Sequence, residues 1–168
     1  MRSAAALAAI LVAIALQTTL ASLVFQGTAA IDLVLIVVVF FAIKSGPVTG
    51  LLGGTVAGLI QDALSSGILG IGGLAKTIIG FLSGVLGTQL IVTAPLPRFL
   101  LLLLATGLNA AIFMGLYTLL NLRQFEAPWP AVAGQALGNA FVGAVAFTLV
   151  EWIPGFVDRR RARRFLKR

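Results

Sequence analysis

The sequence contains no histidine and no cysteine, and both absences exclude chemistry. A chain without them cannot build the usual zinc sites, a Ser-His couple or the two-histidine helix motif of metalloproteases. It also cannot form disulfides, so the redox compartment is left undetermined. The carboxylates are scattered along the chain and not paired; they are Asp32, Asp62, Glu126, Glu151 and Asp158. We therefore expect no enzyme activity, no metal and no cofactor.

Charge is also scarce. Only 10% of the 168 residues are charged, whereas 60% are hydrophobic. A soluble domain could not solvate such a surface, so the composition predicts an all-α integral membrane protein. The length suits one compact bundle, because each crossing takes about 20 residues and short turns join the helices.

Hydrophobic runs predict six transmembrane helices, with expected ranges 4–25, 29–43, 47–64, 71–92, 99–120 and 131–152. The second run, counted from Ala29, is about 15 residues or roughly 22 Å long, which is short for a ~30 Å hydrocarbon core. Local thinning of the bilayer, snorkelling by Lys44 or shelter within the bundle must compensate.

Two alternatives to this six-helix assignment stay open. The basic start at Arg2, the apolar run and the small residues Ala21 and Ser22 also fit a signal peptide, although apolar character continues to Phe25. In the second alternative the short second run is re-entrant, which gives five helices.

Positive charge predicts the orientation. With six helices, one side of the membrane receives Arg2, Lys44, Arg98 and the basic tail, and the other receives only Arg123. This bias places both termini in the cytoplasm. We expect a membrane domain over residues 1–157 and a basic cytoplasmic tail over 158–168. The tail arginines predicted to meet anionic lipid headgroups are Arg159, Arg160, Arg161, Arg163 and Arg164. Nucleic-acid binding would need a folded reader or interleaved aromatic residues, and only Phe165 is present.

Small residues recur four apart on several runs, which places them on one helix face. In lipid, such stripes let helix backbones approach closely, and this approach drives association. We interpret them as helix-packing or partner-docking faces, with the two stripes at 46–62 and 72–88 meeting each other. The residues concerned are Gly50, Gly54, Gly58, Gly80, Gly84, Gly134 and Gly138. A further alanine stripe is formed by Ala5, Ala9 and Ala13.

Asp62 and Lys76 are the two ionisable residues placed within apolar runs. A lone charge at mid-membrane costs about 2.5 to 3.5 kcal/mol, so such residues usually face the protein interior and find partners. The short hairpin around Ser65 should place Asp62 and Lys76 at the same depth in the membrane. This predicts either a salt bridge between them or a cavity for a ligand or ion. Further polar side chains inside predicted helices are Asn109, Gln135 and Asn139.

Three segments carry a family resemblance: residues 46–54 (GPVTGLLGG), 57–65 (AGLIQDALS) and 69–84 (LGIGGLAKTIIGFLSG). They resemble the bacterial rod shape-determining protein MreD, and Asp62 before the small-residue loop is the most telling position. The start of the second helix at Asp32 is similar as well, although Ile31 stands where the family often has proline.

The resemblance implies a non-enzymatic scaffold in the bacterial inner membrane, within the cell-elongation machinery of peptidoglycan synthesis. The implied partners are the single-span protein MreC and, through it, the actin-like MreB and peptidoglycan synthases. It also implies an architecture similar to the substrate-binding subunits of energy-coupling-factor transporters. The alternative function is therefore a transporter subunit with a polar pocket open to the outside, which Asp62, Lys76, Arg123, Gln135 and Asn139 would line. Short outward loops argue against that alternative, because they leave little to cap a ligand. The oligomeric state is left open.

Overall fold

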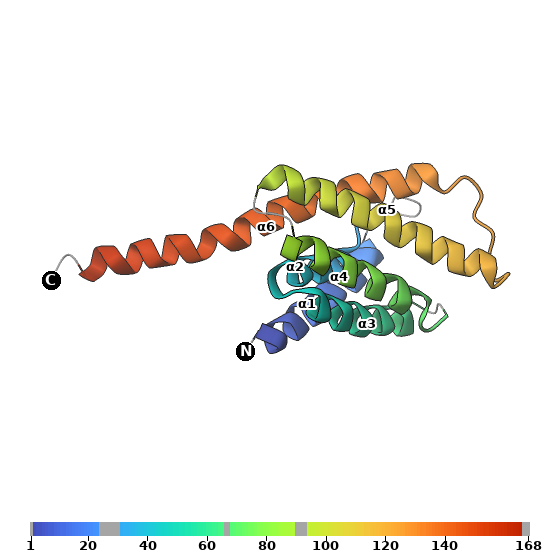
Figure 1. Cartoon of the computed structure of the whole chain (residues 1–168), viewed down its shortest axis with the longest axis horizontal. Helices are drawn as coiled ribbons and strands as arrows, with labels where there is room; N and C mark the ends of the chain where they lie inside the picture. The colour runs from blue at the N-terminus through green and yellow to red at the C-terminus, as the bar shows by residue number, and fades with distance from the viewer. Residues whose placement is uncertain (1, 24–30, 66–67, 90–93, 166–168) are drawn as a thin grey trace.

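The computed structural model describes residues 2–23, 31–65, 68–89 and 94–165, with side-chain surroundings for 6–19, 31–65, 68–89 and 94–150. These residues form six helices (Figure 1). Their bounds are α1 Arg2–Leu23, α2 Leu33–Ser45, α3 Pro47–Leu64, α4 Ile71–Gln89, α5 Pro95–Leu119 and α6 Trp129–Phe165. The fold is all-helical, as predicted.

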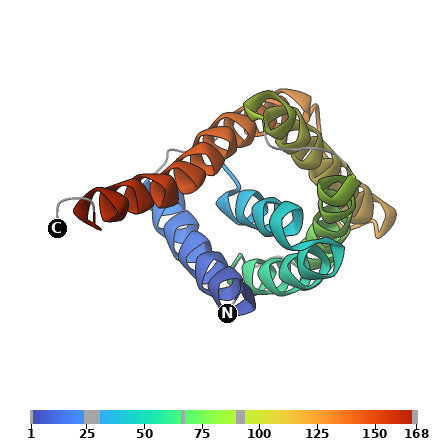
Figure 2. The same cartoon turned by 60° about the vertical axis from the view of Figure 1, so that its left-hand side comes forward.

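Helix α2 lies at the centre and the other helices surround it (Figure 2). It has only 13 residues, or about 20 Å at 1.5 Å per residue. Val34, Leu35, Val39 and Ala42 are all 0% exposed. Of the three remedies expected for a short helix, the described residues therefore show shelter within the bundle.

Two apolar clusters form around α2. One face of α2, with Leu35, Ile36 and Val39, packs against α4, α5 and α6. Another face, with Val34 and Val38, packs against α1 and α3. The partners in the first cluster are Ile79, Leu101, Leu102, Ala105, Ala140 and Phe147, and those in the second are Ile10, Ala13, Ile14 and Ala57. Helix α2 is thus the shared core of both halves of the bundle.

Helices α3 and α4 touch through their backbones. A Cβ atom added to Gly50 would collide with the Gly80 carbonyl, and one added to Gly54 would collide with the Lys76 carbonyl. A Cβ on Gly58 would lie 2.5 Å from the Gly73 Cα. Real Cβ atoms do not approach so closely, so this contact requires glycine. The two predicted stripes do meet.

Several helix bounds differ from expectation. Helix α2 begins at Leu33 and not at 29, and α6 begins at Trp129 and not at 131. Helix α5 begins at Pro95, where the missing proline N–H leaves no extra donor unsatisfied in the first turn. Helix α6 continues beyond Trp152 to Phe165, so most of the predicted tail lies within the same helix. Residues 166–168, and the side chains of the tail arginines, lie outside the described residues.

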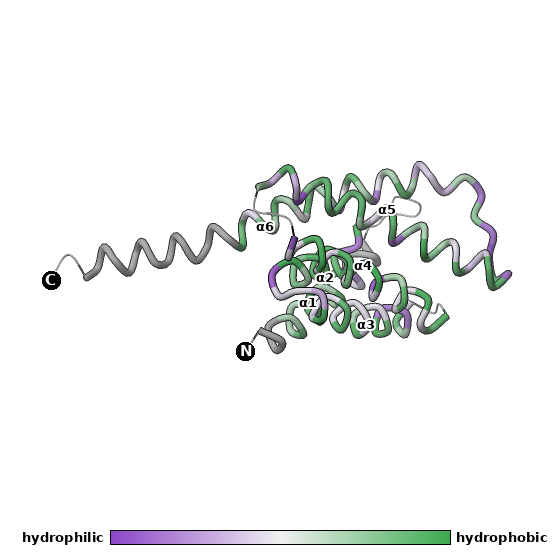
Figure 3. The backbone as a smooth tube through the Cα atoms, viewed as in Figure 1, coloured by the Kyte–Doolittle hydropathy of each residue, from purple (hydrophilic) through white to green (hydrophobic). Residues whose placement is uncertain are grey.

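Apolar side chains cover much of the outer surface. Among the described residues, three stretches are long and apolar enough to cross a membrane: Ile71–Gln89, Pro95–Leu119 and Trp129–Val150. Shorter apolar stretches are Ala6–Thr19 and Leu33–Ser45. Figure 3 shows hydrophobic colouring along the helices and a hydrophilic connection between α5 and α6.

Candidate functional site

Asp32 lies at the N-terminus of the central helix α2, and its carboxylate makes two interactions. Its Oδ1 accepts a hydrogen bond from the Leu35 N–H at 2.9 Å, which caps α2. Its Oδ2 lies 2.8 Å from the Lys76 Nζ on α4. Both side chains are buried, with 8% and 7% of their area exposed. The carboxylate and the ammonium therefore neutralise each other inside the bundle.

Asp62 at the end of α3 is satisfied by backbone donors. Its Oδ2 accepts hydrogen bonds from the Gly70 N–H at 2.9 Å and the Gly73 N–H at 3.0 Å. These N–H groups belong to the start of α4, where negative charge is favoured. Gly70 has φ +103°, a conformation that side chains rarely tolerate. Asp62 thus bonds the end of α3 to the start of α4.

The expected salt bridge between Asp62 and Lys76 was wrong. Lys76 pairs with Asp32, because the Asp62 carboxylate turns to the first N–H groups of α4 while Lys76 faces the central helix α2. Both Asp62 and Lys76 nevertheless line one cavity, as the other interpretation of these residues expected.

A polar chain extends from Asp32 to α5 and α6. The Asp32 N–H donates to Asn139 Oδ1 at 2.8 Å, and Asn139 Nδ2 donates to Thr106 Oγ1 at 3.1 Å. Asn139 is 0% exposed. Gln17 of α1 also contributes, because its Oε1 accepts from the Val34 N–H at 3.3 Å. The start of α2 is therefore bonded to α1, α4 and α6.

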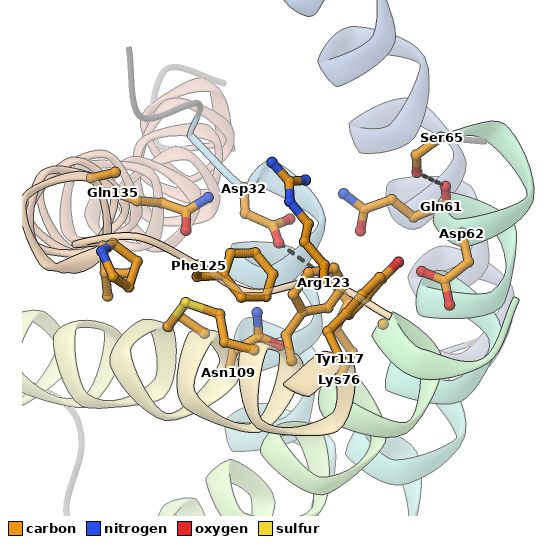
Figure 4. Close-up of a pocket in the computed structure, with 17 residues that line it drawn as sticks. Asp32, Gln61, Asp62, Ser65, Lys76, Asn109, Tyr117, Arg123, Phe125 and Gln135 are labelled. Atoms are coloured by element: carbon orange, nitrogen blue, oxygen red, sulfur yellow. Dashed lines mark hydrogen bonds and ion pairs between the residues drawn. The ribbon is translucent and has the colours of Figure 1, made fainter. Parts of the chain in front are cut away.

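The cavity beside this network has a volume of about 670 Å³ and lies between α3, α4, α5, α6 and the α5–α6 connection. Its polar and charged lining residues are Asp32, Gln61, Asp62, Ser65, Lys76, Asn109, Arg123 and Gln135. Its aromatic lining residues are Phe113, Tyr117 and Phe125. Figure 4 shows Gln61, Asn109 and Gln135 projecting into this space from three different helices, with Arg123 and Phe125 between them.

Two buried oxygens in the cavity have no hydrogen-bond partner among the described residues: Gln61 Oε1 and Asn109 Oδ1. Arg123, in the α5–α6 connection, holds its guanidinium 5.2 Å from the centre of the Phe125 ring. The described residues give Arg123 no carboxylate partner within 4.0 Å. The cavity thus offers two acceptors and one cation that the protein itself leaves available.

Of the five residues expected in a polar pocket, four line this cavity: Asp62, Lys76, Arg123 and Gln135. Asn139 lies behind it and reaches it through Asp32. The connection that looked too short to cap a ligand contributes Arg123, Phe125 and Pro128 to the lining. Gln61 and Tyr117 were not predicted, although Gln61 stands directly before Asp62 within the apolar run of α3.

A second depression is apolar. A groove of about 900 Å³ runs between α4, α5 and α6. Gly107 and Trp129 lie in it, and a Cβ added to Gly107 would meet nothing within 4 Å. Gly134 is exposed, and a Cβ on Gly138 would contact only the Ile31 side chain, at 3.5 Å. These glycines are not used for close helix packing among the described residues.

Long apolar helices around a buried ion pair and a satisfied polar network define a helical membrane protein. The family described as rod shape-determining protein MreD matches residues 3–157 of the 168-residue chain, and the chain belongs to that family. Membership assigns it a role in determining rod shape. No curated protein and no solved structure matches the chain, so the expected likeness to energy-coupling-factor subunits is without support.

Proposed function

We propose that this chain is a non-enzymatic scaffold of the rod-shape machinery in the bacterial inner membrane, and that it holds the single-span protein MreC by its apolar groove. Through MreC it would reach an MreB-like actin homologue and peptidoglycan synthases. The family match supports the machinery. The groove is the single observation that supports the docking site.

The groove suits a helix better than a solute. Its lining is almost wholly apolar, and it lies on α4, α5 and α6, whose described residues include stretches long and apolar enough to span. Leu104 is 68% exposed and Leu108 44% exposed there. In lipid, a partner helix gains by close packing against small residues such as Gly107 and Ala111. Gly50, Gly54 and Gly58 of α3 offer no such surface, because the backbone of α4 already lies against them.

We further propose that all six helices are embedded in the membrane and that both termini face the cytoplasm. The Lys/Arg asymmetry supports this orientation. It places the polar cavity, which the α3–α4 turn and the α5–α6 connection surround, on the outer side. Reporter fusions at Ser66 and Pro128 should then read external and those at Gly46 and Arg168 cytoplasmic. An external reading at Arg168 would contradict the orientation.

Gly107→Leu tests the docking site. A Cβ at Gly107 meets nothing within 4 Å, so the new side chain can enter the groove and folding should be unchanged. Co-purification of MreC in detergent should fall at least about tenfold, which is about 1.4 kcal/mol of binding. Gly115→Leu is the matched control, because a Cβ there also meets nothing within 4 Å but Gly115 does not line the groove. Equal MreC recovery with both variants would refute docking at this groove.

A further inference from the structure

The polar cavity is separate in chemistry from the apolar groove, and among the described residues only Val132 lines both. Its volume of about 670 Å³ lies within the range of pockets that enclose small molecules, which is about 300 to 1,000 Å³. It also combines apolar walls with a few convergent polar groups, as such pockets do. Docking of a partner helix at the groove leaves this space unexplained.

The charges already present limit what the cavity can take. Asp32 is neutralised by Lys76, and Asp62 accepts two backbone N–H groups. Neither carboxylate therefore calls for a cation from outside. Arg123 carries a positive charge that no carboxylate of the described residues meets within 4.0 Å. The formal charges of these four residues sum to zero, and Arg123 is the cation to which an anion can still bind.

Hydrogen bonding adds a second requirement. Gln61 Oε1 and Asn109 Oδ1 are buried acceptors without a partner among the described residues. A buried acceptor left unsatisfied costs about 1 to 3 kcal/mol. Both face the cavity from different helices (Figure 4). A molecule that occupies the cavity should therefore bring N–H or O–H donors to these two oxygens.

We infer that the cavity binds a small oxyanion that also carries amide N–H or hydroxyl groups. Its carboxylate or phosphate would lie on the Arg123 guanidinium, where paired N–H donors match a planar oxyanion. Its donors would reach Gln61 and Asn109, and its body would pack against Phe113, Tyr117 and Phe125. The same chemistry occurs in soluble sugar acids and in hydroxylated lipid headgroups.

Three probes test whether the ligand needs a negative charge and whether it is a soluble sugar acid or a lipid headgroup. N-acetylmuramic acid has a carboxylate, an acetamide N–H and hydroxyls, and N-acetylglucosamine lacks the carboxylate. Dihexanoyl-phosphatidylglycerol presents a phosphate and two hydroxyls as a lipid does. Calorimetry with the full chain in maltoside micelles measures the two sugars, and native mass spectrometry measures retention of the lipid.

We expect either N-acetylmuramic acid or the lipid to bind, and Arg123→Gln to weaken that binding at least about tenfold, as loss of a charged hydrogen bond does. Gln61→Met and Asn109→Leu should each weaken it about threefold to tenfold. Gln89→Met is the matched control, because Gln89 is exposed at the far end of α4. Preference for the sugar acid identifies a soluble ligand, and preference for the lipid identifies a headgroup site.

Three results would overturn the inference. The first is that none of the three probes binds, which leaves the two oxygens to water. The second is that N-acetylglucosamine binds as tightly as N-acetylmuramic acid and the lipid does not bind, which removes the role of Arg123. The third is that the cavity variants and Gln89→Met bind alike. Arg123 is exposed, so its variant should fold, and size-exclusion chromatography verifies this for each protein.

Discussion

The α3–α4 pair and the α5–α6 pair both carry glycines, yet the glycines at the α3–α4 contact and those of α5 meet different surroundings. On α3 and α4, Gly50 and Gly80 lie against each other's carbonyl groups. On α5, a Cβ at Gly107 or Gly115 would meet nothing within 4 Å. A small-residue stripe therefore marks a possible close contact, and only the neighbouring helix decides whether the contact is used.

The two pairs are also held together by different forces. Helices α3 and α4 combine backbone contact with a hydrogen bond of 2.8 Å between the Thr55 and Thr77 hydroxyls. Helices α5 and α6 pack large side chains around α2, including Phe147, whose ring centre is 4.8 Å from that of Phe40. Added side-chain atoms at the α3–α4 contact should therefore lower stability, whereas the outer surface of the α5–α6 pair has room for them.

The largest effect is expected at the ion pair between Asp32, at the start of α2, and Lys76 of α4, because Asp32 is also bonded to Asn139 of α6. Asp32→Asn keeps a capping side chain but leaves the Lys76 ammonium buried without a carboxylate, and should lower the unfolding free energy by about 3 to 5 kcal/mol. Adding Lys76→Met should recover part of that loss, because the stranded charge is removed. Unfolding free energies of the single and double variants, measured in mixed micelles, give the coupling energy between Asp32 and Lys76. The double variant Asp62→Asn with Lys76→Met is the control. Its loss of unfolding free energy should equal the sum of the losses of the two single variants.

Gly50→Leu should have the next largest effect. The new side chain collides with the Gly80 backbone, so α3 and α4 must separate, at about 3 kcal/mol or more. Gly107→Leu should stay within about 0.5 kcal/mol of the original protein, as open surface positions do. Thermal unfolding of both variants measures the contrast, and equal losses would remove the distinction between the two helix pairs.

Asn139→Leu should cost about 1 to 3 kcal/mol, because it leaves the Asp32 N–H without its acceptor in a buried site. The change tests whether α5 and α6 depend on this polar link as well as on apolar packing. Gln124→Leu, at an exposed position in the α5–α6 connection, controls for added hydrophobicity. An unfolding free energy unchanged by Asn139→Leu would mean that apolar packing alone holds this pair.

The smallest effect is expected from Thr55→Val, at about 0.6 kcal/mol, the average for interhelical hydrogen bonds in membranes. Thr55→Val with Thr77→Val should cost little more than either change alone, because both remove the same bond. Thr148→Val serves as the control, since the Thr148 hydroxyl donates to the Ala144 carbonyl of its own helix. Additive losses would show that the two threonines do not act together.

Much of the α3–α4 hairpin could be predicted from the sequence. Pro47 starts α3 and Leu64 ends it as expected, because proline fits the first helical turn and the small Ser-Ser-Gly segment ends the run. The meeting of the glycine stripes also followed from their spacing, since a short turn forces the two helices side by side. Local signals were sufficient here because the contacts are local in sequence.

The partner of Lys76 could not be predicted in the same way. Three ionisable residues, Asp32, Asp62 and Lys76, stand near helix ends at one level, and sequence distance favoured the nearer carboxylate. The choice depends on how α2 is rotated against α4, which the large side chains of both apolar clusters determine. The cavity was likewise hidden, because Gln61, Asn109 and Arg123 come from segments that only the tertiary fold brings together.

The contact between Asp32 and Lys76 has a consequence for synthesis. Domains generally fold from the N-terminus as the chain emerges, so the Asp32 carboxylate is synthesised before Lys76. The ammonium therefore meets its counter-charge on arrival and avoids the cost of lying alone in lipid. Asn139 is synthesised last of the three residues, and it bonds α6 to the Asp32–Lys76 pair that has already formed. The chain order thus provides Lys76 and Asn139 with a partner that is already made, and moving α2 behind α4 by circular permutation would remove that protection from Lys76 during biogenesis.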